Sequence, residues 1–116
     1  MSERRQEARV RTKGGFPVTE EIQLYRALIA KKGISNQLVK VAEEASELAQ
    51  AALKLMQSQD PVEFSQRRRD VAEEIADNQL LAEQLIDHYQ LSDLIVYYRT
   101  LKLRKIKQLI GEETEQ

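Results

Sequence analysis

Residues 38–56 read LVKVAEEASELAQAALKLM, and residues 71–86 read VAEEIADNQLLAEQLI. In both stretches apolar residues recur every three or four positions, which is the spacing of a helix with one apolar face. Each stretch also carries two adjacent glutamates and then a further acid on the next helical turn. The two stretches therefore predict two amphipathic helices with the same acidic pattern, and the rest of the chain is organised around them.

Four of these acids form two matched pairs, Glu44 with Glu47 and Glu74 with Asp77. The members of each pair stand at positions i and i+3, so they lie about 60° apart on one side of their helix. Glu74 falls inside the apolar arc of the second helix. A carboxylate at a core-facing position costs several kcal/mol unless something pairs with it. The pattern therefore predicts a cation or hydrogen-bond donors at this place.

Capping signals divide the chain into four helices. Gly33 ends a first helix, whose Ile22, Tyr25, Leu28 and Ile29 are predicted core residues. Side chains that suit an N-cap precede the other three helices. The first predicted helix covers about residues 20–32. The second begins at a cap at Ser35 and ends at 57 or 58, the third begins at a cap at Asp60 and ends near 88, and the fourth begins at a cap at Ser92 and ends near 111.

The predicted fold class is all-α, an antiparallel four-helix bundle-like subunit. The short link after residue 58 makes the two acid-bearing helices antiparallel neighbours. No stretch has the alternation or the Asn-Gly and Asp-Gly turns of a hairpin. The expected organisation is a flexible basic arm over residues 1–18, one helical domain over 19–111 and a frayed acidic tail over 112–116.

Composition narrows the classes of function. The 116 residues include no cysteine, which excludes disulfides and thiolate metal sites and fits a reducing, cytoplasmic setting. A net charge of −1 gives no general attraction to a nucleic acid polymer or to an anionic membrane. No apolar run approaches the ~20 residues that span a bilayer. The basic arm is expected to be solvated. The alternative is that it contacts phosphate or a partner protein.

Lysines stand where an anion could meet the acids. Lys102 and Lys105 project from the apolar side of the last helix, either reaching outward to solvent or meeting an anion. Lys40 and Lys54 lie about two turns before and after Glu47, on its side of the helix. A solvated lysine or an intrahelical ion pair is the alternative for each of them.

Magnesium explains these features together. It takes oxygen ligands and is usually bound by a few carboxylates and by substrate phosphates. Glu44, Glu47, Glu74 and Asp77 would supply the carboxylates, and a divalent ion makes their mutual closeness tolerable. The lysines would neutralise phosphate oxygens, so the predicted substrate is a polyphosphate.

The order Glu43-Glu44-x-x-Glu47 and then Glu74-x-x-Asp77 resembles the EExxE and ExxD signature of the MazG-like, all-alpha nucleoside triphosphate pyrophosphohydrolases. The surrounding VAEEASEL at residues 41–48 and AEEIAD at 72–77 strengthen the resemblance, which covers about residues 37–105. The chain is most similar to the short single-domain versions found in phage-related genomes.

The resemblance implies a helical homodimer or homotetramer that hydrolyses a nucleoside triphosphate to a monophosphate and pyrophosphate. It implies that Mg2+ is the cofactor, with Mn2+ as a substitute, and that Glu44, Glu47, Glu74 and Asp77 are its ligands. Glu43 would orient or deprotonate the attacking water. The lysines Lys40, Lys54, Lys102 and Lys105 would bind substrate.

Asn78 departs from this family pattern, in which an aliphatic residue usually follows the motif aspartate. It is either a core polar group satisfied by a neighbour or a contact to nucleotide or to a metal-bound water. We favour the second role because Asn78 lies beside Glu74 and Asp77.

Two other classes of protein were weighed. A di-iron carboxylate bundle needs Glu-x-x-His pairs, and the only histidine, His88, follows Leu85 at that spacing. The remaining alternative is a non-enzymatic helical bundle that binds a partner protein. Self-association is expected in either case, because a chain of this size with few aromatic residues makes a thin core.

Overall fold

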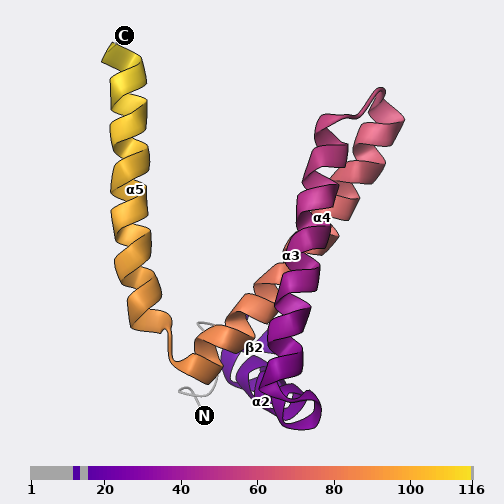
Figure 1. Ribbon diagram of the computed structural model, residues 1–116, viewed down its shortest axis with the longest axis vertical. Helices are drawn as coiled ribbons and strands as arrows, with labels where there is room; N and C mark the ends of the chain where they lie inside the picture. The colour runs from indigo at the N-terminus through magenta and orange to yellow at the C-terminus, as the bar shows by residue number, and fades with distance from the viewer. Residues whose placement is uncertain (1–11, 14–15, 116) are drawn as a thin grey trace. The chain divides into compact units, whose positions relative to one another are not determined.

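The computed structural model describes residues 12–13 and 16–115, and almost all of them lie in four α-helices (Figure 1). The prediction of an all-α chain is confirmed. The helices are α2 (Val18–Lys32), α3 (Ile34–Met56), α4 (Pro61–Tyr89) and α5 (Ser92–Glu115). The first eleven residues of the predicted basic arm lie outside the described residues.

Two short strands precede the helices. β1 (Thr12–Lys13) pairs antiparallel with β2 (Phe16–Pro17), Thr12 opposite Pro17 and Lys13 opposite Phe16. The prediction that no part of the chain forms a strand is therefore wrong for these residues. The sequence places Gly-Gly between the two strands, and a two-residue glycine link is a hairpin signal as well as a helix breaker.

Gly33 alone joins α2 to α3. Its amide donates to the carbonyl of Ile29 at 2.7 Å, and its own carbonyl accepts from the amide of Gln37 at 3.3 Å. Its φ of 89° lies in the left-handed region that glycine adopts without steric cost. Gly33 therefore ends α2 and is also the N-cap of α3, so the predicted cap Ser35 lies inside α3 instead.

Helices α3 and α4 form an antiparallel hairpin and run side by side in Figure 1. Gln37 bonds Gln84 near the start of α3, and Arg67 bonds the carbonyl of Lys54 near its end. The predicted N-cap of α4 is confirmed, because Asp60 Oδ1 accepts from the amide of Glu63 at 2.8 Å. The hairpin therefore brings the two acidic stretches into contact.

The chain divides into two compact units, Met1–Gln84 and Leu85–Gln116, which are described separately. In the second unit, α4 ends at Tyr89 and is followed by Gln90, whose φ of 55° allows the amide of Leu91 to reach the carbonyl of Ile86 at 3.0 Å. The carbonyl of Leu91 then accepts from the amide of Ile95 at 2.9 Å. Leu91 therefore stands at the N-cap position, and Ser92, the predicted cap, is the first residue of α5.

Helix α5 passes its predicted end at Gly111 and continues to Glu115. Residues 112–115 are therefore helical, which corrects the expectation of a frayed tail over that range. Glycine in a helix interior costs about 1 kcal/mol relative to alanine and does not by itself end a helix. Lys102 and Lys105 lie on this helix with exposed side chains.

The buried positions of the first unit differ from the predicted core. Tyr25 and Ile29 of α2 are buried as expected, but Leu28 is partly exposed. On α3 the buried residues are Gln37, Glu44 and Ala51. Of the predicted apolar arc of α3, Val41 and Leu48 are partly buried, whereas Leu38, Leu53 and Met56 are exposed, the last at 73%.

The helical period predicted for α3 is confirmed, and its most buried face lies at one edge of the predicted apolar arc. Gln37, Glu44 and Ala51 recur every seven residues, so they share one face, and that face packs against α4. Among the described residues, no helix is both long enough and apolar enough to cross a bilayer.

Candidate functional site

Three acids from the two helices of the hairpin meet at one point. Glu44 of α3 and Glu74 and Asp77 of α4 each offer a carboxylate oxygen, and these oxygens lie within 4.8 Å of one another. Glu74 and Asp77 reach the same point because they stand one helical turn apart. We call these three residues the carboxylate trio.

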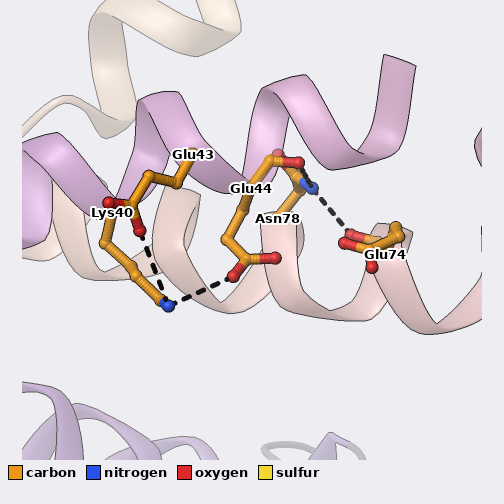
Figure 2. A network of polar contacts seen from close by, with 5 residues as sticks. All are labelled: Lys40, Glu43, Glu44, Glu74 and Asn78. Carbon is orange, nitrogen blue, oxygen red and sulfur yellow. Dashed lines mark hydrogen bonds and ion pairs between the residues drawn. The ribbon is translucent and has the colours of Figure 1, made fainter. Parts of the chain in front are cut away.

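Two oxygens of the carboxylate trio lack a partner. Glu44 is only 7% exposed, and one of its oxygens lies 3.4 Å from the Lys40 ammonium (Figure 2). Its other oxygen, Oε2, and Glu74 Oε2 are both buried, and no hydrogen-bond partner among the described residues reaches either of them. Such oxygens are costly to bury unless a cation or a proton neutralises them.

Protons can neutralise part of the negative charge on these buried carboxylates. Burial, a hydrogen bond to Glu44 that forms when Glu74 carries a proton, and the charges of Glu47, Glu44 and Asp77 raise the pKa of Glu74 to about 7. A shared hydrogen bond with Glu44 and the negative charge of Glu44 likewise raise the pKa of Glu47. The cluster thus holds protons at a pH where an isolated glutamate is ionised.

The pKa of Glu44, in contrast, is lowered. Burial acts to raise the pKa of its carboxyl, but hydrogen bonds with Lys40, Glu47 and Glu74 outweigh burial and lower it. The Lys40 pKa rises in turn because its ammonium bonds Glu44 and lies near the charges of Glu44 and Glu43. Glu44 is therefore the ionised centre of the cluster, and its neighbours supply positive charge or protons.

Asn78 holds the two helices together at this point. Its amide nitrogen donates to the backbone carbonyl of Glu44 at 3.0 Å and to that of Glu74 at 2.7 Å (Figure 2). This is the first of the two roles weighed for Asn78, a polar group satisfied by neighbours. Only its carbonyl oxygen is left by these bonds for a contact to substrate, so such a contact stays a prediction.

Glu43 lies beside the carboxylate trio and not within it. Its carboxylate is 3.8 Å from the Lys40 ammonium, and its side chain is 58% exposed. Lys40 therefore bridges Glu43 and Glu44 in Figure 2. The predicted role of Glu43 toward a water molecule stays a prediction.

Two cavities adjoin the cluster, one after the other along the hairpin. The first, of about 720 Å³, is lined by Glu44 and Asp77 together with Lys40. The second, of about 210 Å³, is lined by Glu47 and Glu74 together with Lys54. The four predicted metal ligands are thus shared between two adjacent cavities, each with a lysine.

Arg67 is a cation that the sequence analysis missed. It lines the second cavity, donates to the carbonyl of Lys54 at 2.6 Å and pairs with Glu63 at 2.5 Å. These two contacts fix the guanidinium across the hairpin from Lys54. A signal was present in the sequence, because Arg67 stands at i+4 from Glu63, a spacing that favours ion pairs on a helix.

A buried glutamine pair was missed as well. Gln37 Nε2 donates to Gln84 Oε1 at 2.8 Å, and the two residues are 7% and 4% exposed. Gln37 precedes Glu44 by seven residues and Gln84 follows Asp77 by seven, so each lies on the same face as its acid. That spacing was the available signal.

Helix α2 is held against this hairpin by Tyr25, whose hydroxyl donates to the carboxylate of Glu83. Burial and the adjacent Glu83 raise the pKa of the tyrosine. Tyr25 is 8% exposed, so the packing role predicted for it is confirmed. The other two predicted substrate lysines, Lys102 and Lys105, belong to the second unit, and their contact with a substrate stays a prediction.

The chain matches no protein-family model, no curated protein and no solved structure at a significant level. The carboxylate trio and the cavities beside it are therefore the features that bear on its function.

Proposed function

We propose that this protein is a Mg2+-dependent nucleoside triphosphate pyrophosphohydrolase of the MazG-like, all-alpha type. The observation that supports this most is the carboxylate trio, in which two buried oxygens have no hydrogen-bond partner among the described residues. An isolated acidic group on a surface would be solvated. This one is set into the seam between two helices, where a cation would stabilise it.

The donor set fits magnesium. All the offered ligand atoms are carboxylate oxygens, which hard divalent ions prefer, and the chain has no cysteine. Glu44, Glu74 and Asp77 would hold the ion, with Glu47 as a further ligand. A bound magnesium ion supplies positive charge against phosphate oxygens and lowers the pKa of coordinated water.

The surrounding cations fit a substrate that carries phosphates. Lys40 contacts Glu44 at the first cavity, and Lys54 and Arg67 line the second. Positive groups next to carboxylates are expected where a metal and a phosphate chain are bound together. The second cavity, at about 210 Å³, suits a pyrophosphate-sized group.

The proposed reaction is hydrolysis at the α-phosphorus. The oxygen of a water molecule forms a bond to the α-phosphorus. The bond between the α-phosphorus and the oxygen that bridges to the β-phosphorus breaks. Pyrophosphate leaves with the bridging oxygen, and the nucleoside monophosphate keeps the water oxygen. Glu43, exposed beside Glu44, would accept the proton that the water loses.

The first experiment measures pyrophosphate release from canonical and modified nucleoside triphosphates, with Mg2+ and with chelator. We expect release that requires Mg2+. The substitutions Glu44→Gln and Asp77→Asn should each reduce it by more than about 100-fold, since loss of even an outer contact to a metal ligand costs 10- to 100-fold.

The matched control is Glu73→Gln, which changes an exposed glutamate next to Glu74 that is not part of the carboxylate trio. It should retain wild-type release. If no triphosphate yields pyrophosphate while all variants remain folded, the hydrolase is refuted. The non-enzymatic partner-binding bundle then becomes the better description.

A further inference from the structure

We propose that the larger cavity binds the nucleobase of the substrate and that the Gln37–Gln84 pair reads its hydrogen-bonding edge. The catalytic part of this inference depends on the function proposed above. The binding part does not, since a nucleotide could occupy the cavity whether or not it is hydrolysed. The two parts can therefore be tested separately.

The first support is the position and size of the cavity. Its volume of about 720 Å³ is in the range of small-molecule sites. Glu44 and Asp77 form part of its wall, so a ligand within it lies next to the carboxylate trio. A nucleoside bound here would present its phosphates to those acids.

The second support is the apolar part of the wall. Leu28 of α2 and Leu80 and Leu81 of α4 line the cavity, and Leu28 and Leu80 are partly exposed at 37% and 49%. Leucines that stay exposed beside a cavity offer surface for the flat face of a heteroaromatic ring. Phosphate alone would gain nothing from these side chains.

The third support is the hydrogen-bonding pattern of the glutamine pair. Their mutual bond uses Gln37 Nε2 as donor and Gln84 Oε1 as acceptor. That bond leaves Gln37 Oε1 as an acceptor and Gln84 Nε2 as a donor, and both residues line the cavity. A donor and an acceptor in one wall of the cavity suit the edge of a nucleobase, and the bond between the two amides restrains both side chains.

The fourth support is the order of groups along the hairpin. The larger cavity is lined from α3 by residues 36–44, and the smaller cavity, with Lys54 and Arg67, is lined from α3 by residues 47–54. The carboxylates lie where the lining of the larger cavity meets that of the smaller one. A triphosphate that places its base by Gln84 and its terminal phosphates by Lys54 would have its α-phosphorus near the acids.

The test of selectivity compares kcat/KM for the four canonical nucleoside triphosphates in wild type, Gln84→Leu and Gln79→Leu. Gln79 is the matched control, an exposed glutamine of α4 outside the cavity lining. We expect Gln84→Leu to reduce the preference for the best base about tenfold or more, as for loss of a paired base contact. Gln79→Leu should leave the preference unchanged.

The test of binding uses wild-type protein in chelator and follows the side-chain amide NMR signals of Gln37 and Gln84. Nucleoside monophosphates should shift both signals, and ribose 5-phosphate, which lacks a base, should not. Such shifts support the base site even if no hydrolysis is found or Gln84→Leu does not fold.

Three outcomes would overturn the inference. The first is amide signals that do not respond to any nucleotide, and the second is signals that respond equally to ribose 5-phosphate. The third is a folded Gln84→Leu protein that hydrolyses the four triphosphates with the wild-type ranking. In that last case pyrophosphate release would still stand, and only the assignment of the base site would fail.

Discussion

The carboxyl group of Glu74 is partly buried and lies close to other carboxylates. Its Oε2 has no hydrogen-bond partner among the described residues, and the negative charges of Glu44, Glu47 and Asp77 lie close to it. Each of these factors favours the protonated form. A metal ion would reverse the balance, because binding requires the carboxylate and releases the proton.

The stability of the metal-free protein should therefore fall as the pH rises from 4.5 through about 7. Glu74 has its ordinary pKa of 4.5 when unfolded and about 7 when folded, so the folded state binds more protons in this window. Glu47 acts in the same direction, whereas the lowered pKa of Glu44 matters only at more acidic pH. Urea unfolding in chelator, at about pH 5.5 and about pH 8, measures the effect.

The control for this prediction is Glu74→Gln, which cannot ionise and should show a weaker dependence on pH. Adding Mg2+ to wild type at about pH 8 should raise the free energy of unfolding, since ligands that bind only the folded state stabilise it. Equal pH dependence in wild type and Glu74→Gln would show that Glu74 does not titrate in this window.

Asn78 illustrates how one amide can set the geometry of a site through bonds to the backbone. Its two hydrogen bonds end on the backbones of Glu44 and Glu74, which carry two of the three acids. The positions of the carboxylates thus depend on a residue between them. This is a physical reason for a polar side chain where an aliphatic one would pack equally well.

At the scale of the elements, the α3–α4 hairpin has a polar seam. Gln37, Glu44, Asn78 and Gln84 all lie between the two helices and bond across it or to its backbone. Hydrogen bonds between buried groups on two helices favour one register of the helices, because any other register leaves those groups unpaired. The seam therefore holds α3 and α4 in the alignment that brings the acids together.

The link between α2 and α3 gives a prediction at this scale. Gly33→Ala should destabilise the protein by about 1 kcal/mol or more, because a φ of 89° is strained for any residue with a Cβ. No neighbouring atom lies within 4 Å of the added Cβ, so the cost is one of backbone conformation alone. Thermal unfolding followed by circular dichroism measures it.

Gly111→Ala is the matched control for that substitution. Gly111 lies within α5 and also has no atom within 4 Å of an added Cβ, but its φ is not positive. Alanine there should be neutral or stabilise α5 by about 0.5–1 kcal/mol. If both substitutions changed the melting temperature alike, the conformation assigned to Gly33 would be wrong.

At the scale of the whole molecule, little apolar surface is covered. Only four hydrophobic residues of the described part of the chain are buried, and all four belong to the first unit. Large apolar side chains remain exposed along α3, among them Leu38, Leu53 and Met56. Extended apolar surfaces of this kind usually mark an interface between proteins.

We therefore predict that the protein is a homodimer or homotetramer in solution. Light scattering coupled to size-exclusion chromatography should give two or four times the chain mass of 13.4 kDa. Leu53→Glu places a charge on the exposed arc of α3 and should shift the protein toward a smaller species while the helices remain. A monodisperse wild-type monomer would contradict the prediction.

The sequence by itself determined the local structure of this protein. Four helices, the cap at Asp60 and the end of α2 at Gly33 follow from side chains that act within a few residues of themselves. The sequence also indicated that the acids of α3 and α4 would face each other, because a short link between two helices makes them antiparallel.

Only the tertiary structure decided which side of each helix is buried. The apolar arc of α3 has the right period, yet Gln37 and Glu44 are buried while Leu38 and Leu53 are exposed. Periodicity fixes which residues share a face, but not which of two faces a neighbour covers. The bond of Asn78 to Glu44, the Gln37–Gln84 pair and the bond of Arg67 to Lys54 follow from that packing, since each joins residues far apart in sequence.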